Sequence, residues 1–462
     1  MPRDVREPAK GSRTSHPVKE RLLRPKLLAT AALIAAAAMF LVGALGPLRA
    51  DRSDAGPVGS SVATLDAVAP ATSEGSDATI ATFRDRIDTD TENPKLHAQL
   101  GLAYLQQMRA EADPSALPSA EQALRRSLEL QPRNNLEAFV GMASLANARH
   151  DFSHSVEWSR RAIETNPYNA AAYGLLGDAL FELGRVRAAD AAYQRMVDRR
   201  PDVASYVRAS YALQYDGRFR AAIHAIRLAL QAAGPSGETA AWVRHQMGDI
   251  YAQLRDTAEV ARQNRIGIAL APGYAPPTVG LAEAHIARGR LGKALGIMEV
   301  AASRLSSLEY TIKLGDLYQA TGRTVQAEAQ YTAVADKLAE YRSAGVLPDA
   351  DFIVFYADHD LRPAAALREA FSIYRNRPTT KIADALAWML HSVGRDHAAW
   401  RYARETIDAS DKDSSMLFHA GTIARSLDHD DGATRLMRKA LRLDPAFSVL
   451  QAPIARRMVA GR

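Results

Sequence analysis

The chain has 462 residues, which is too long for one compact core and suits either several domains or an array of repeats. Its composition is 47% hydrophobic and 24% charged, as in folded proteins, and the absence of cysteine excludes disulfides, thiolate zinc sites and cysteine nucleophiles. The net charge of +6 invites a nucleic-acid partner, but a surplus of five positive charges falls within residues 1–26. The rest of the chain is close to neutral and has no basic stripe, so we expect no nucleic-acid partner.

The N-terminal part of the sequence predicts a membrane anchor. Residues 27–48 (LLATAALIAAAAMFLVGALGPL) have no charged side chain and can cross a bilayer as one helix. Because the basic segment 1–26 precedes them, the positive-inside tendency places that segment in the cytoplasm and the repeat domain outside, in a single-pass cell-membrane protein. Two alternatives stay open: cleavage as a signal peptide, which would give a secreted protein, or a buried helix of a soluble domain. Residues 49–77 are small, polar and rich in Gly and Pro, as in a flexible linker.

Beyond the linker the sequence repeats itself. In YGLLGDALFELGRVRAADAAYQRMVDRRP, residues 173–201, one amphipathic helix ends at Gly184 and a second ends before Pro201. The stretch TIKLGDLYQATGRTVQAEAQYTAV, residues 311–334, has the same arrangement with Gly322 at the break. A small side chain then recurs at steps of 33 to 39 residues, at Ala120, Ser155, Ala189, Ala222, Val260, Ala294, Ala327, Ala366, Ala399 and Ala433.

This pattern resembles the tetratricopeptide repeat, a helix pair of 34 residues. The resemblance covers about residues 94–445 and implies an all-α, right-handed superhelical solenoid of about ten helix pairs, stabilised by stacking between neighbours. We predict that the solenoid spans 78–452, with a leading helix at 80–87, and that residues 453–462 form a C-terminal cap.

Three places depart from the pattern. The first unit carries an insertion, MRAEADPSALPSA, between its two helices. The eighth unit, 348–378, is the weakest match to the repeat. The connection at 341–352 is longer than the others, and we expect it to form a seam that bends the superhelix.

Candidate chemistry is sparse. No phosphate-binding glycine loop and no G-x-S-x-G turn is present. The clusters ADHD at 357–360 and DHDD at 428–431 contain the side chains that metals prefer, but the repeat register places both at turns between helices. We expect these side chains to point to solvent, with Asp430 or Asp431 capping the following helix. The sequence therefore predicts no metal, no cofactor, no small-molecule substrate and no enzymatic activity.

The resemblance directs attention to a binding groove. In the tetratricopeptide family the first helix of each unit lines a concave groove, through positions 2, 5, 9 and 12, that holds a peptide or a partner's helix. Acidic residues at position 9 favour a basic or amine-bearing partner, although a polar residue there can serve solvation alone. The groove residues that this register selects are Tyr211 and Gln214 in unit four, Trp242, His245 and Asp249 in unit five, Glu283 in unit six, Asp316 and Gln319 in unit seven, and Trp388 and His391 in unit nine.

These features together predict a membrane-tethered scaffold that binds a protein or peptide partner and supports envelope assembly, secretion or surface-polymer export. A regulatory or accessory subunit of a membrane enzyme complex is the alternative. An enzyme with an unrecognised active site is the weakest reading.

Overall fold

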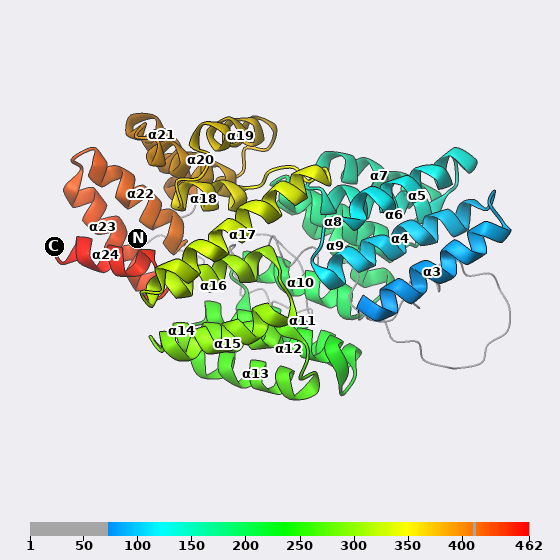
Figure 1. Ribbon diagram of the computed structural model, residues 1–462, viewed down its shortest axis with the longest axis horizontal. Helices are drawn as coiled ribbons and strands as arrows, with labels where there is room; N and C mark the ends of the chain where they lie inside the picture. The colour runs from blue at the N-terminus through cyan, green and yellow to red at the C-terminus, as the bar shows by residue number, and fades with distance from the viewer. Residues whose placement is uncertain (1–72, 410–412, 462) are drawn as a thin grey trace, which may run out of the picture.

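The computed structural model describes residues 73–409 and 413–461, and every element within them is a helix, α3 to α24 (Figure 1). The basic segment 1–26, the apolar run 27–48 and most of the linker lie outside the described residues. Within the described part of the chain, no helix combines the length and the apolar character needed to cross a membrane.

The body consists of ten consecutive helix pairs, as the repeat predicts, and we number them as units one to ten. Units one to five are α4 (Pro94–Glu111) with α5 (Ala116–Leu130), α6 (Leu136–Ala148) with α7 (Phe152–Thr165), α8 (Ala170–Glu182) with α9 (Val186–Arg199), α10 (Val203–Tyr215) with α11 (Phe219–Ala233), and α12 (Gly237–Gln253) with α13 (Thr257–Leu270). Units six to ten are α14 (Ala275–Ile286) with α15 (Leu291–Arg304), α16 (Leu308–Ala320) with α17 (Thr324–Ser343), α18 (Ala350–Asp358) with α19 (Pro363–Asn376), α20 (Thr380–Ser392) with α21 (Asp396–Ala409), and α22 (Ser414–Ser426) with α23 (Asp430–Leu443).

Two further helices flank the ten units. α3 (Ser73–Thr89) packs against α4 and contains the predicted leading helix, while α24 (Gln451–Val459) packs against α23. The core is a row of apolar clusters between neighbouring helices rather than one central core, as stacking of repeats requires. The predicted all-α solenoid of helix pairs is thus confirmed, and the right-handedness of its superhelix stays a prediction.

Small residues bring the two helices of a unit together. A Cβ atom on Gly177 of α8 would lie 2.4 Å from the ring of Tyr193 on α9, and one on Gly315 of α16 would lie 2.6 Å from the ring of Tyr331 on α17. The glycine of the first helix therefore makes room for a large aromatic side chain of the second. The same close approach contributes to the period of the sequence. It recurs between Gly101 and Leu124 in unit one, Gly248 and Asn264 in unit five, and Gly421 and Met437 in unit ten.

The turn between the two helices of a unit needs one residue in the left-handed region. Gly184 and Gly322 supply it with φ angles of 72° and 77°. Three units place a residue with a side chain at the same position: His150, Arg255 and Asp428 have φ angles of 58°, 65° and 62°. The turn geometry is therefore common to the units, and glycine is only the least strained residue that can adopt it.

The acidic cluster at 428–431 lies at such a turn, as predicted, but its capping role is different. α23 begins at Asp430, and the residue before it, His429, makes no capping hydrogen bond with its side chain. Asp430 and Asp431 lie in the first turn of α23, where their charge favours the positive end of the helix. The prediction that one of them caps the helix was wrong, because the turn places both residues inside it.

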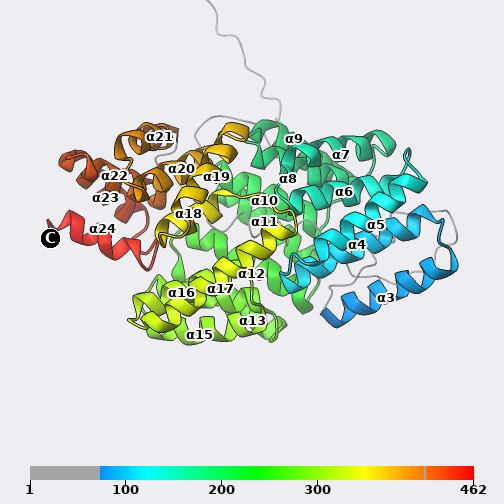
Figure 2. The ribbon, with the colours of Figure 1, turned by 45° about the horizontal axis from the view of Figure 1, so that its top comes forward.

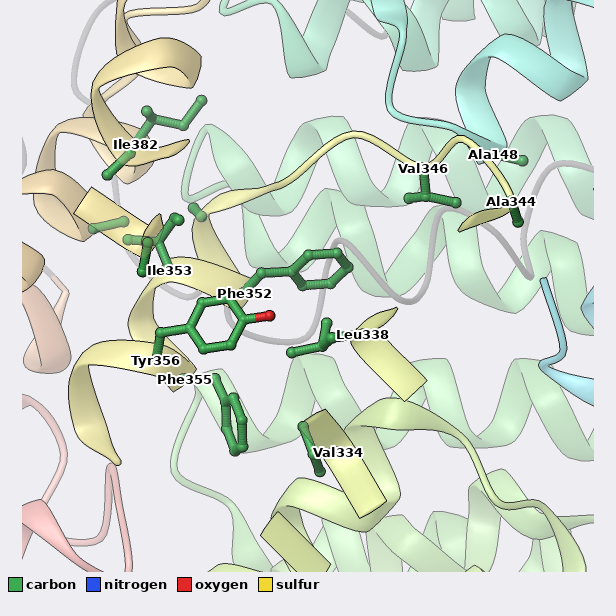
Figure 3. Close-up of a cluster of buried hydrophobic side chains, with 14 of the residues drawn as sticks. Ala148, Val334, Leu338, Ala344, Val346, Phe352, Ile353, Phe355, Tyr356 and Ile382 are labelled. Carbon is green, nitrogen blue, oxygen red and sulfur yellow. The ribbon is translucent and has the colours of Figure 1, made fainter. Parts of the chain in front are cut away.

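The departures from the repeat bring distant parts of the chain together. α17 has 20 residues and crosses the molecule from the side of α16 towards α4 and α6 (Figures 1 and 2). Residues 344–349, which we call the strap, then connect α17 to α18. Ala344 and Val346 of the strap are buried close to Ala148 at the end of α6 (Figure 3). The predicted seam is therefore a contact between unit two and the junction of units seven and eight.

Candidate functional site

The ten residues selected by the register all lie on first helices, at three places along the solenoid. We call the side of the solenoid that these positions form the inner face. Tyr211 and Gln214 are on α10, and Trp388 and His391 are on α20. The other six are on α12, α14 and α16: Trp242, His245, Asp249, Glu283, Asp316 and Gln319.

Two residues of unit five hold the structure together. Trp242 is 3% exposed and belongs to a buried cluster with Leu213 of α10. His245 is also buried, and its Nδ1 lies 3.0 Å from Oδ1 of Asn264 on α13. These side chains tie α12 to its neighbours and present little surface, and their role as partner contacts stays a prediction.

The two residues of unit four also contact neighbouring units. Tyr211 packs edge-on against Phe181 of α8, with 5.0 Å between ring centroids. Burial raises the pKa of Tyr211 well above its ordinary value, and the nearby charge of Glu182 adds to the shift. Gln214 accepts a hydrogen bond of 2.9 Å through its Oε1 atom from Nε2 of Gln253 on α12.

Four acidic residues occupy position 9 of their units: Asp178, Asp249, Glu283 and Asp316. Two of them are neutralised by a base from the next unit. Arg208 donates through Nε and Nη2 to both carboxylate oxygens of Asp178, at 2.9 and 2.8 Å. Lys313 forms ion pairs with Glu283 and, at 2.8 Å, with Glu309. Burial acts to raise the pKa of Glu283, but the attraction and hydrogen bond of Lys313 outweigh it, and the pKa is lowered. These two acids are satisfied within the protein.

The other two acids at position 9, Asp249 and Asp316, form no ion pair with a lysine or arginine within the described residues; their partners are the imidazoles of His245 and His359, at 3.8 and 3.9 Å. The residues 30 positions after them are Val279 and Val346, where the paired acids have Arg208 and Lys313. The side chain of Asp249 is 18% exposed, and its Oδ2 atom makes no hydrogen bond within the described residues. Burial raises the pKa of Asp249 to about 6, against the attraction of His245. His245, which lies beside Oδ2 of Asp249, carries a charge only when it is protonated. A desolvated acid that faces only an imidazole would gain from a cation supplied by a partner.

Asp316 lies beside an aromatic group. It accepts a hydrogen bond of 3.0 Å from the hydroxyl of Tyr331, and burial raises its pKa to about 7. The ring of His359 is 3.8 Å from that of Tyr331 and 4.7 Å from that of Phe355, and burial lowers the pKa of His359 to about 4. The expectation that this histidine points to solvent was wrong, because unit seven covers the turn. Gln319, one helical turn after Asp316, is exposed.

Unit nine forms a third group around an indole. Trp388 is 9% exposed, and its Nε1 donates to Oδ1 of Asp358 at 2.8 Å. The imidazoles of His391 and His419 stack on it, with centroid distances of 5.1 and 4.2 Å. His419 is buried 2.8 Å from Asp384; burial alone would lower the pKa of His419, but the attraction of Asp384 raises it.

The register did not select the bases that neutralise the inner face, although the sequence holds a signal for them. In four cases a side chain on a first helix contacts the side chain that lies 30 residues later in the sequence, on the first helix of the next unit. That spacing is shorter than the repeat because the contact slopes across neighbouring helices. The four contacts are Asp178 with Arg208, Glu283 with Lys313, Asp351 with Lys381, and Asp358 with Trp388. Among the described residues, no group of three or more His, Asp or Glu side chains is arranged to hold a metal.

A solenoid of helix pairs with charged and aromatic side chains along its inner face is the architecture of a protein-interaction scaffold. Residues 170–203, which span unit three, match a family model described as tetratricopeptide repeat, so the chain contains such a repeat. Over 198 residues the chain is 25% identical to anaphase-promoting complex subunit 7 of Arabidopsis thaliana, a match that covers 43% of this chain and 35% of that protein. The chain thus matches about a third of the length of this relative.

Solved structures of helical repeat proteins are similar at a lower level. A structure of human IFIT1, a dimer with PPP-AAAA, is 16% identical, with a TM-score of 0.44 and coverage of 72% of this chain and 78% of that one. A chain of the APC/C hetero-tetramer Cut9–Hcn1 is 12% identical, with a TM-score of 0.41 and coverage of 84% and 93%.

Proposed function

We propose that this protein is a membrane-tethered scaffold that binds an extended basic segment of a partner protein on its inner face, near Asp249 and Asp316. The observation that carries the proposal is the unequal pairing of the acids at position 9. Asp178 and Glu283 are neutralised by Arg208 and Lys313, whereas Asp249 and Asp316 are not.

The electrostatics of the two acids that lack a lysine or arginine partner favour a cationic ligand. Their side chains are 18% and 26% exposed although Oδ2 of Asp249 is covered, so each side chain has some contact with solvent while its surroundings disfavour the ionised form. A lysine or arginine side chain of the partner would stabilise the ionised carboxylates and replace lost hydration with a charge-assisted hydrogen bond. An extended peptide suits this arrangement because the two acids belong to units five and seven, with unit six between them.

A binding assay tests the proposal. Fluorescence anisotropy would compare a labelled lysine- and arginine-rich peptide with a matched peptide that carries glutamate at those positions, on the full chain in detergent. The Asp249→Asn, Asp316→Asn double variant should weaken binding of the basic peptide at least about fivefold. Glu328→Gln is the matched control, since Glu328 is an exposed acid on the second helix of unit seven. Equal affinity for the two peptides, or no effect of the double variant, would refute the proposal.

The membrane tether is a second part of the proposal and rests on the apolar run at 27–48. It places the repeats outside the cytoplasm, in envelope assembly, secretion or surface-polymer export. Alkaline phosphatase fused after residue 60 should be active, because it matures outside the cytoplasm, and the fusion should stay in the membrane fraction after alkaline extraction. An inactive fusion would contradict the topology, and an active but soluble one would indicate signal cleavage.

A further inference from the structure

The strap joins two parts of the solenoid that are far apart in sequence. We call units one to three the N-terminal arm and units eight to ten the C-terminal arm. A stack held only by contacts between neighbouring units has no contact of this kind. In this chain, however, the turn of unit two meets residues about 195 positions later. The solenoid is therefore closed on itself at this point (Figures 1 and 3).

Hydrogen bonds to backbone carbonyls fix the strap on the turn of unit two. The amide of Leu347 donates to the carbonyl of Arg149 at 2.9 Å, and Nε of Arg149 donates to the carbonyl of Ala344 at 3.0 Å. Nδ1 of His150 lies 3.2 Å from the carbonyl of Leu347. Gly345 has a φ of 81°, and a Cβ atom there would lie 3.2 Å from Nε of Arg149. The strap sequence thus suits both the bend and the close approach.

A buried charge network reinforces this joint. Nη2 of Arg377 pairs with Oδ1 of Asp349 at 2.6 Å, and its Nη1 lies 3.5 Å from Oε2 of Glu182 on the N-terminal arm. The guanidinium of Arg377 also lies 4.7 Å from the ring centroid of Phe152 on α7. His150 lies 3.8 Å from Asp349. We call these five residues the clasp. The side chain of Glu182 is 18% exposed, whereas the side chains of His150, Asp349 and Arg377 and the whole residue Phe152 are at most 9% exposed.

The C-terminal arm contacts the middle units at several places besides the junction of units seven and eight. Arg255 in the turn of unit five pairs with Asp444, just after α23, at 2.6 Å. Val449, before α24, packs on the apolar cluster of units six and seven. Aromatic contacts between Tyr331 and Phe355 join α17 to α18. The N-terminal arm contacts the C-terminal arm through the strap and clasp, and the turn of unit three also approaches unit nine, where a Cβ atom on Gly184 would lie 3.4 Å from Thr379.

We propose that the strap and clasp form a latch that closes the N-terminal arm onto the C-terminal arm and opens while the helix pairs stay folded. The joint also buries apolar side chains, since Ala148, Ala344 and Val346 belong to one buried cluster. Parts of one chain that meet through an interface of transient size and polarity can move relative to each other. Buried ion pairs give such a joint specificity more than stability. Opening would separate Glu182 from Arg377 and leave this acid available to a basic partner, and this consequence rests on the proposed function.

Distance measurements between labels test the latch directly. The chain has no cysteine, so Tyr168→Cys on the N-terminal arm and Val325→Cys at the start of α17 can carry two spin labels. Both positions are strongly exposed, at 81% and 76%. The otherwise unchanged chain should give one narrow distance distribution. In the Arg377→Met variant we expect a longer, broader population, with the open fraction raised roughly tenfold or more. Arg262→Met, which breaks an ion pair within α13, should leave the distribution unchanged.

Hydrogen exchange at the amide of Leu347 gives an independent readout, because that amide is bonded only when the strap is docked. The Arg377→Met variant should exchange it at least about tenfold faster, while amides within α8 keep their protection. Glu182→Gln is a milder second variant that should change the distances and the exchange rate in the same direction. It serves as the test if Arg377→Met fails to fold. The latch is refuted if neither variant changes the distance distribution, or if Leu347 exchanges only together with the helices. An open latch with unchanged affinity for the basic peptide would leave the latch standing and remove its link to the inner face.

Discussion

The sharpest test of the energetics concerns the ion pair between Asp178 and Arg208. Both side chains are almost fully buried, at 4% and 5% exposure, and they join through two hydrogen bonds of 2.9 and 2.8 Å. Asp178→Leu would leave the guanidinium in the core without its counter-charge, which typically costs about 3–5 kcal/mol. Arg208→Met would strand the carboxylate and should cost a similar amount. The double variant replaces the pair with apolar groups and should recover most of the loss, because two desolvation penalties disappear together.

Urea denaturation followed by circular dichroism would measure the loss, with hydrogen exchange to locate it. Because a repeat array need not unfold in one step, the expected exchange increase is centred on α8 and α10, the helices that the pair connects. Arg126→Met is the surface comparison: Arg126 and Glu129 are exposed partners one turn apart, and their loss should cost less than about 1 kcal/mol. The reasoning fails if Asp178→Leu costs no more than Arg126→Met, or if the double variant is as unstable as the sum of the singles.

Two further predictions concern the turns and the inner face. Gly394→Ala should destabilise the protein by about 1 kcal/mol, because φ is 72° at this residue. Gly296→Ala, in the exposed middle of α15, should stabilise the protein by about 0.5–1 kcal/mol. Thermal melts that gave stability changes of the same sign for both variants would contradict this prediction. Asp316 has a raised pKa of about 7, so it disfavours the folded state increasingly as pH rises from about 4 towards 7. Asp316→Asn should therefore raise the melting temperature relative to the parent at pH 8 and not at pH 4. An equal shift at both pH values would show that ionisation of Asp316 is not the cause.

The fold could be predicted from the sequence because its determinants are local. The small residues at Ala189 and Ala327 are fully buried, and Gly184 and Gly322 adopt the left-handed turn that the pattern indicates. Each of these roles involves only one helix pair and its neighbour, so each repeats with the period of the sequence. Closure by the strap has no such period. It depends on a contact across 195 residues, and sequence spacing carries no information about it.

The candidate site could be predicted in position but not in exposure. The register correctly places Trp242 and Trp388 on first helices, yet the structure buries both side chains to 9% exposure or less. Whether a side chain on the inner face is covered depends on the size of residues in the next unit, such as His419 beside Trp388. A period of repeats specifies which side of a helix faces inwards. It does not specify which neighbour is large enough to cover it.

The spacing of 30 residues explains where a partner can add binding energy on this surface. An acid at position 9 that forms an ion pair with a base on the next first helix, as Asp178 does with Arg208, holds two units together. A ligand cation could bind such an acid only by displacing the internal base, which would then be buried without its counter-charge. A ligand therefore gains little binding energy there. Asp249 and Asp316 meet valines at the same spacing and keep raised pKa values of about 6 and about 7. Where the contact between an acid and a base is formed, it stabilises neighbouring units. Where it is absent, the acid stays available, and a cationic side chain of a partner gains most binding energy there.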